Sequence, residues 1–221
     1  MISFFKMTPV LLLLIAVACA SGNPATPRTS PQAPSTTASA RDTTEKPQSG
    51  VNAADVSFIS GMIGHHAQAI VMSKWAPTHG ASPAVVTLAE RIINAQQDEI
   101  TAMRKWLGDH HQPVPEVSAH GIMMDMNGMH HEMVMPGMLT DAQLKQLDEA
   151  RGKEFDRLFL TFMIQHHRGA VTMVNDLFAT SGAAQEVSVY KLASDAFADQ
   201  TTEIERMQKM LASMLFETEV R

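Results

Sequence analysis

The chain of 221 residues contains a single cysteine, and aromatic residues make up only 5% of it. One cysteine, Cys19, excludes an intramolecular disulfide and a cysteine-based zinc site. The formal net charge of −6 excludes the basic footprint typical of nucleic-acid binding, so no nucleic-acid partner is expected. Because aromatic residues and β-branched runs are scarce, the composition favours helices.

The N-terminal residues have the pattern of an export signal. Lys6 precedes an apolar run, residues 10–18, that is too short to span a membrane. The stretch AVAC at residues 16–19 resembles a bacterial lipoprotein cleavage box, which predicts a signal peptide over 1–19 and a lipid on Cys19. Ordinary cleavage after Ala20 is the alternative. In either case we expect an exported protein on the periplasmic or extracytoplasmic side, and the lipid would anchor it to the membrane.

The remaining sequence divides into a tether and a helical domain. Residues 20–53 are rich in Pro, Ser and Thr and have little to bury, which predicts a disordered tether. Apolar spacing of three and four predicts helices over about 55–76, 82–107, 153–180 and 184–216. Ser82-Pro83 and a Thr140/Gln143 capping box mark two helix starts, the second for a short extra helix.

The domain, residues 54–216, contains an internal repeat. FISGMIGHHAQAIVM (58–72) and FLTFMIQHHRGAVTM (159–173) are identical at seven of fifteen positions. The first repeat covers 54–108, the connector 109–139 and the second repeat 140–216. Two helical hairpins of one design predict an all-α four-helix bundle with pseudo-two-fold symmetry.

The His pairs of the two repeats are candidate metal ligands. A buried neutral imidazole needs partners for both ring nitrogens, and one helix face supplies few. Met62 lies three residues before His65, and Met163 lies at the same position before His166, so thioether and imidazole groups share a face. This soft to borderline ligand set favours copper. The alternative is that these are core histidines of a Met-rich bundle. The candidates from this pattern are Met62, His65, His66, Met72, Met163, His166, His167 and Met173.

The connector between the repeats is unusually rich in the same two residue types, with seven Met and three His between positions 120 and 138. We interpret it as a mobile arm that captures or passes on Cu(I), and that would also bind Ag(I). The alternative is a flap that covers the bundle with flexible side chains. The candidates here are His120, Met123, Met124, Met126, Met129, His130, His131, Met133, Met135 and Met138.

The duplicated motif, the tract FDRLFLTFMIQHHRGAVTM and the preceding MPGMLTDAQLKQL resemble the bacterial domain-of-unknown-function 305 family over about residues 54–215. The resemblance implies a ferritin-like four-helix bundle and, for some members, periplasmic copper binding linked to copper resistance. It adds Met103 and Met207 to the candidate ligands. The first repeat has Ala67-Gln68 where the second has Arg168-Gly169, so the two halves are expected to differ in exposure or affinity.

The predicted function is copper binding for storage, buffering or transfer, with copper as the bound metal and a second protein that receives it. No enzymatic activity is expected. A ferritin-like metal oxidase is one alternative, although Glu-x-x-His is absent and only Glu99 and Glu203 are candidate inward acids. A haem-binding bundle is another, although Cys-x-x-Cys-His is absent. A purely structural lipoprotein is the third. Since a ligating histidine must be neutral, copper binding should weaken as the pH falls through about 6.

Overall fold

The computed structural model describes residues 51–118, 121–126 and 129–219; the side chains of 117–118, 121–126, 129–133 and 215–219 are not described. The predicted signal peptide, Cys19 and most of the tether lie outside the described residues, as does His120. Everything described below belongs to one unit, residues 45–221.

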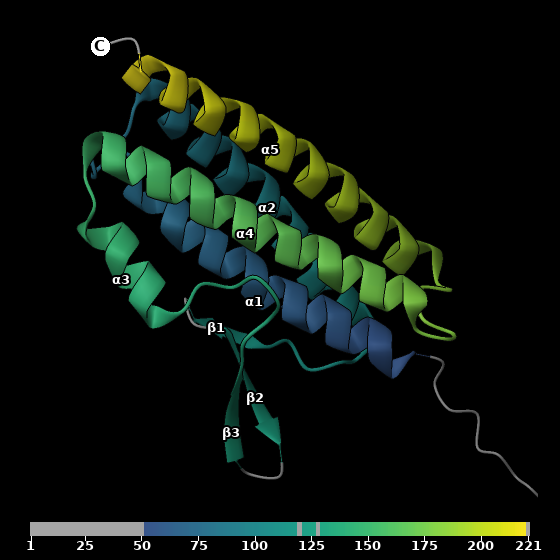
Figure 1. Cartoon of the computed structure of the whole chain (residues 1–221). Coiled ribbons are helices and arrows are strands. Elements are labelled where there is room, and N and C mark those ends of the chain that lie inside the picture. The colour runs from purple at the N-terminus through teal and green to yellow at the C-terminus, as the bar shows by residue number, and fades with distance from the viewer. Residues whose placement is uncertain (1–50, 119–120, 127–128, 220–221) are drawn as a thin grey trace, which may run out of the picture. The chain divides into compact units, whose positions relative to one another are not determined.

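Two antiparallel helical hairpins form the bundle, which confirms the predicted fold class (Figure 1). Helix α1 packs against α2 and α4 against α5, while α1 also packs along α4. A short helix, α3, lies between the hairpins in sequence. The helices are α1 Ala53–Trp75, α2 Pro83–Asp109, α3 Asp141–Glu149, α4 Gly152–Ala179 and α5 Val187–Glu219.

The helix starts follow from local capping. The side chain of Ser82 accepts a hydrogen bond from the Val85 amide at the start of α2, and Thr140 and Gln143 form a complete capping box at α3. Helix α1 begins at Ala53, two residues before the predicted start, because the Asn52 side chain accepts from the Ala54 amide.

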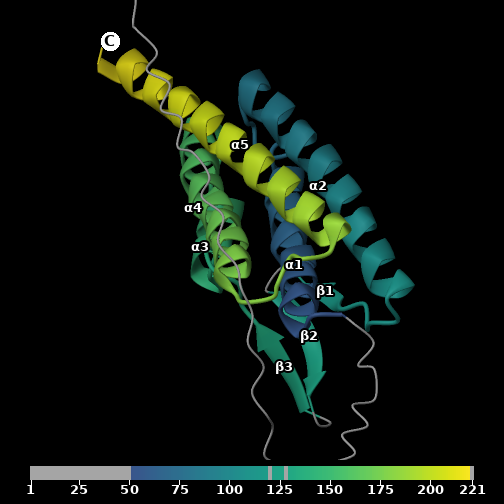
Figure 2. The same cartoon turned by 90° about the vertical axis from the view of Figure 1, so that its right-hand side faces the viewer.

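The connector contains three short antiparallel strands that the sequence reading did not predict: β1 Glu116–Ser118, β2 Gly121–Met126 and β3 Met129–Met133. Met126 is paired with Met129. The two residues between them in the sequence are Asn127-Gly128, the dipeptide typical of a two-residue hairpin loop. The sequence therefore carries a signal for this strand pair. β1 and β2 contact α1, and Figure 2 shows β2 and β3 side by side below that helix.

Two buried aspartates, one in each hairpin, make equivalent contacts to the opposite hairpin, in agreement with the predicted pseudo-two-fold symmetry. Asp55 of α1 accepts a hydrogen bond of 2.7 Å from the Ala184 amide, just before α5. Asp156 of α4 accepts from the Ser82 amide, just before α2, at 3.1 and 3.2 Å. Each aspartate therefore holds the turn of the other hairpin.

Helices α1 and α4 run antiparallel across the centre of the bundle. One buried cluster contains Phe58 from the start of α1 and Leu177 from the end of α4. A second contains Phe159 from the first half of α4 and Ala76 after α1. The histidine pairs lie in the middle of α1 and α4, between these two apolar regions.

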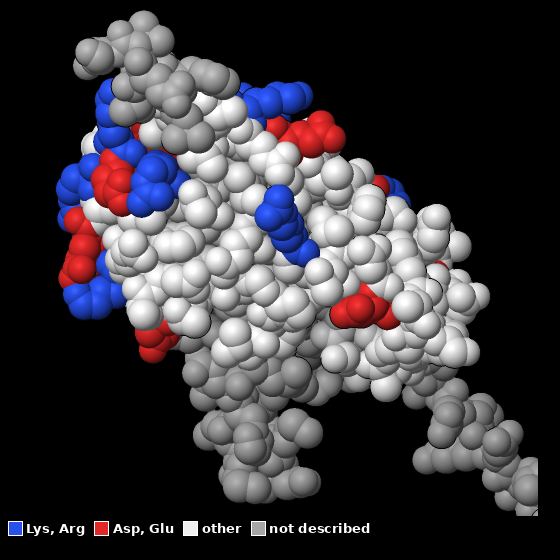
Figure 3. All heavy atoms as spheres, in the orientation of Figure 1, with Lys and Arg blue, Asp and Glu red and all other residues white. Residues whose placement is uncertain are grey.

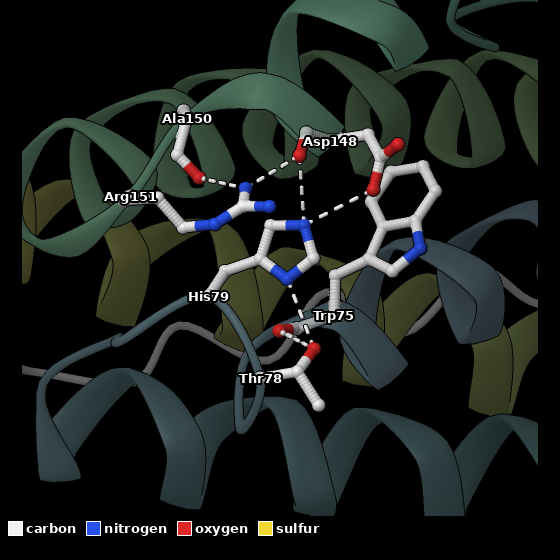
Figure 4. A network of polar contacts seen from close by, with 6 residues as sticks. All are labelled: Trp75, Thr78, His79, Asp148, Ala150 and Arg151. Carbon is white, nitrogen blue, oxygen red and sulfur yellow. Dashed lines mark hydrogen bonds and ion pairs between the residues drawn. The ribbon is translucent and has the colours of Figure 1, made fainter.

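Hydrogen bonds of His79 hold helix α3 against the bundle, as Figure 4 shows. His79 Nε2 donates to the carbonyl of Asp148 at 2.9 Å and lies 3.0 Å from its carboxylate, while Nδ1 lies 2.9 Å from Thr78 Oγ1. Arg151 donates to the carbonyls of Asp148 and Ala150. His79 is therefore a buried histidine with a complete structural role.

No helix in the described parts of the chain combines the length and apolar character needed to cross a membrane. In Figure 3, charged side chains gather at the end where α3 meets α4, and the face over the remainder of α4 carries few charges.

Candidate metal centre

The four histidines of the repeated motif converge in one layer of the bundle. His65 and His66 of α1 and His166 and His167 of α4 all have 0% exposure. The His65 and His166 rings lie 3.7 Å apart between centroids, at an interplanar angle of 36°. His66 and His167 flank them, with ring centroids 6.3 Å from His65 and 6.1 Å from His166 respectively. The two repeats thus contribute to one centre.

Three of these rings direct Nε2 at an acceptor. His65 Nε2 donates to the Pro136 carbonyl at 3.0 Å, and His167 Nε2 donates to Glu203 Oε2 at 2.7 Å. His66 Nε2 lies 2.6 Å from Glu99 Oε2, although its alignment is not that of a hydrogen bond. A carbonyl and a carboxylate can only accept, so the proton of neutral His65 and His167 lies on Nε2. Their Nδ1 atoms then carry the free lone pair.

Most ring nitrogens of this layer have no hydrogen-bond partner. Six of the eight are buried without one: Nδ1 of His65, His66, His166 and His167, and Nε2 of His66 and His166. Two other histidine rings of the bundle, buried His79 and half-buried His110, differ. Both nitrogens of His79 have partners, and His110 contacts the Trp106 carbonyl at 2.8 Å and Glu186 at 3.1 Å. An unpaired buried polar atom costs about 1–3 kcal/mol, so the layer fits a ligand that accepts nitrogen lone pairs.

The polar layer continues onto α2 and α5. Gln96 and Gln200 are each 1% exposed, and Gln96 Nε2 and Oε1 and Gln200 Oε1 also lack partners. The pKa of the Asp199 carboxyl is raised by loss of solvent and then by repulsion from Glu99 and Glu203. Asp199 therefore adds a third acidic group near Glu99 and Glu203, and negative charge beside the layer favours a cation in it.

Burial lowers the pKa of the two facing rings, His65 and His166. The pKa of His65 is held well below 6.5 by desolvation first and then by repulsion from His66 and His167. The pKa of His166 is lowered in the same way, by desolvation and then by His65, His167 and His66. Both rings are therefore neutral at pH 7, the state in which imidazole binds a metal.

The predicted methionine ligands of the helices fall into two buried groups on either side of the histidine layer. Met62, Met103 and Met173 belong to the apolar cluster that also contains Phe58. Met72, Met163 and Met207 belong to the other cluster. None of the six is more than 8% exposed. The structure therefore brings sulfur to both sides of the layer.

The chain between β3 and α3 crosses α1 beside α4, as Figure 1 shows, and we call residues 135–139 the strap. Gln68 of α1 donates to the Leu139 carbonyl and accepts from its amide, and Gln165 of α4 donates to the Gly137 carbonyl. A Cβ at Gly169 would lie 1.9 Å from the Pro136 carbonyl oxygen, so only glycine permits this approach. The strap thus covers the centre.

The predicted connector ligands are only partly described. Met138 is buried and Met135 is half-buried, both in the strap. The backbone of β2 and β3 carries seven further candidates whose side chains are not described: Met123, Met124, Met126, Met129, His130, His131 and Met133. Within the described residues, no three His, Cys, Asp or Glu side chains are arranged to hold a metal ion, a statement that does not include methionine sulfur.

Some residues that position the centre or join the hairpins could not be identified from side-chain patterns in the sequence. The Pro136 carbonyl and the glycine at 169 act through the path of the backbone, which a side-chain pattern does not indicate. Asp55 and Asp156 carried a signal, since they align at the same offset of 101 as the histidines. Their partners are amides in turns, which have no sequence signature.

Three known proteins are similar to this chain in structure or in sequence. A DUF305 protein from Streptomyces coelicolor is 32% identical, with 73% of this chain and 93% of that chain covered and a TM-score of 0.61. CopM in its Cu(II)-bound form is 31% identical, with 72% and 96% covered and a TM-score of 0.56. Uncharacterized protein L153 of Acanthamoeba polyphaga mimivirus is 42% identical over 55 residues, which are 25% of this chain and 36% of that protein.

The match to the family description extends over nearly the whole bundle. The model of the domain of unknown function DUF305 matches residues 55–211, from the buried Asp55 of α1 to Leu211 in α5. This range contains both histidine pairs, the strap and the two methionine groups. The chain therefore belongs to the DUF305 family.

Proposed function

We propose that this protein binds copper as its cargo outside the cytoplasm and stores, buffers or transfers it in the cell envelope. The observation that carries the proposal is the set of six partnerless ring nitrogens in a fully buried layer. A protein gains nothing in stability by burying such atoms unpaired, whereas a bound copper ion accepts the one lone pair that each neutral ring offers.

The donor types support copper over other metals. Neutral imidazole with thioether sulfur on either side is a soft to borderline set that suits copper and, for the sulfur part, Ag(I). Glu203 accepts a hydrogen bond from His167, as carboxylates do for metal-bound histidine, and the Glu99 carboxylate lies 2.6 Å from His66 Nε2. Solved structures of CopM in Cu(II)-, Cu(I)- and Ag-bound forms, at 29–31% identity, add support from the family.

The test is an anaerobic titration of the purified protein with Cu(I) in competition with a chromogenic chelator. Alanine at His65 and His66, at His166 and His167, or at all four positions should lower the stoichiometry or the affinity. The matched control is His111→Ala, which removes an exposed histidine just after α2. Circular dichroism reports whether each variant folds. Identical titration curves for the wild type and the quadruple variant would contradict the proposal.

We also propose that the protein is a binding protein and not an enzyme. The same preparation distinguishes the alternatives, because a metal-dependent oxidase would consume oxygen over many turnovers when loaded with Cu(I) or Fe(II). A haem-binding bundle would show a Soret band after incubation with haemin. Stoichiometric copper uptake without either signal is the expected result.

Export and lipid anchoring at Cys19 complete the proposal. The signal pattern of residues 1–19 supports export, and the Streptomyces coelicolor relative is described as a candidate secreted protein. Mass spectrometry of the mature N-terminus should find a diacylated Cys19, and Cys19→Ala should release the protein from the membrane fraction. An unmodified N-terminus at Ser21 would instead support ordinary cleavage after Ala20.

A further inference from the structure

The two halves of the centre differ at one position beside the histidines. Where the second repeat has Phe162, the first has Gly61, at the same offset of 101 residues. A Cβ at Gly61 would lie 2.7 Å from Met135 Sδ and 3.3 Å from Met173 Cε. The thioether of the strap therefore fills the volume that a side chain would take at this position.

Met135 and Met173 are neighbours at a pocket. Both approach the same point beside Gly61, one from the strap and one from α4. Both also line a pocket of about 250 Å³ between the start of α1 and the end of α4. Asp176, whose side chain is exposed, is among the other lining residues, so this pocket opens to solvent.

The pocket leads towards the buried histidines. Gly61 lies four residues before His65 and hence on the same face of α1, one turn away. Pro136, which follows Met135, lines the pocket and also accepts the hydrogen bond from His65 Nε2. His65 and His166 have 0% exposure, so an ion needs a route of this kind to reach them.

The other half of the bundle has no described counterpart of this arrangement. Met72, which corresponds to Met173, has 0% exposure and lies in the other buried cluster. Phe162 fills the place that corresponds to Gly61. The two halves therefore differ in what lies beside the histidines.

We propose that Met135 and Met173 form a solvent-accessible site for a soft monovalent cation, Cu(I) or Ag(I), and that this site loads the histidine centre. Two uncharged thioethers attract soft ions and not hard divalent ones. Gly61 determines the side of entry because it leaves room for the Met135 sulfur. The loading role rests on the proposed function, whereas the thioether site itself does not.

Loading is tested by stopped-flow transfer of Cu(I) from a chromogenic chelator to the purified protein. Met135→Leu and Met173→Leu keep the size of the side chain and remove the sulfur, and each should slow transfer roughly tenfold, the lower range for loss of a supporting metal contact. The rate of transfer reports loading, and the end point reports how much copper each variant retains. The control is Met210→Leu, at a methionine that lines a different pocket beside α4.

Gly61→Ala gives a second test. The added Cβ meets the end of a flexible side chain and no backbone atom, so the variant should fold while its Met135 sulfur is displaced. It should load as slowly as Met135→Leu. Gly108→Ala is the control, since a Cβ there meets nothing within 4 Å. Loading at the wild-type rate in all three pocket variants would overturn the entry route, even where copper binding itself is intact.

The thioether site is tested separately in the variant with all four histidines replaced by alanine. With ¹³C-labelled methionine methyl groups, Ag(I) should shift the NMR signals of Met135 and Met173, assigned from the two leucine variants. No shift at either signal would overturn the site. A shift in this variant, together with a wild-type protein that fails to take up Cu(I), would retain the thioether site and reject the copper centre.

Discussion

The ring of His65 lies against the ring of His166, 3.7 Å apart between centroids and tilted by 36°, although the two residues come from different hairpins. Two independent sites, one per repeat, would not require this contact. The geometry therefore predicts a centre to which both repeats contribute.

A double-mutant cycle tests whether the centre is shared. His65→Ala and His166→Ala should each weaken Cu(I) binding by about 10- to 100-fold, and the double variant should be little worse than either. Competition titrations give the affinities. If each single variant lost one ion and kept another at wild-type affinity, the repeats would bind separately.

The metal-free protein should lose stability as the pH falls below about 6.5, the ordinary pKa of histidine. The pKa values of His65 and His166 are lower when folded than when unfolded. Below pH 6.5 the unfolded chain therefore binds more protons, and each group reduces the free energy of unfolding by up to about 1.4 kcal/mol per pH unit until its folded pKa is reached. Urea midpoints between about pH 7.5 and 5.5 measure this slope.

The control for this pH dependence is His166→Gln, which removes one of the two groups and should flatten the slope. An unchanged slope would assign the effect to other residues. The same depressed pKa values favour the neutral, metal-binding state of His65 and His166, and the expected weakening of copper binding near pH 6 stays a prediction for the titration.

Asp55→Ala and Asp156→Ala should destabilise the fold by similar amounts, about 1–3 kcal/mol each, because each leaves a turn amide of the opposite hairpin without its acceptor. Chemical unfolding measures both. Asp195→Ala, at an exposed aspartate paired with Lys191, should change stability by no more than about 0.5 kcal/mol. A large difference between the first two variants would argue against their symmetric roles.

Gly169→Ala should detach the strap. Its Cβ would lie 1.9 Å from a backbone oxygen, which cannot move aside as a flexible side chain can. We expect a loss of about 1–3 kcal/mol in the free energy of unfolding and faster proteolysis within residues 134–140. Gly108→Ala should show neither effect. A stable, protease-resistant Gly169→Ala protein would mean that the strap can dock without this close contact.

The helices and the meeting of the two histidine pairs could be predicted from the sequence because both depend on local spacing. Repeated apolar positions define α1 and α4, and the doubled His pair identifies the layer. The strap could not be predicted, because its position depends on a backbone approach at Gly169 and on a side chain missing at Gly61. The strands of the connector could not be predicted from side-chain pattern, because Met and His do not alternate with polar residues there and only the dipeptide Asn127-Gly128 is typical of a hairpin.

The antiparallel crossing of α1 and α4 has a consequence for how such a protein arises. Each hairpin carries half of the histidine layer and half of the reciprocal aspartate contacts, so a single hairpin can complete neither. A shorter ancestor with one hairpin would have had to pair with a second copy of itself to assemble the same layer. Within one chain the two halves need not be identical, and they differ beside the histidines, where one has Phe162 and the other Gly61.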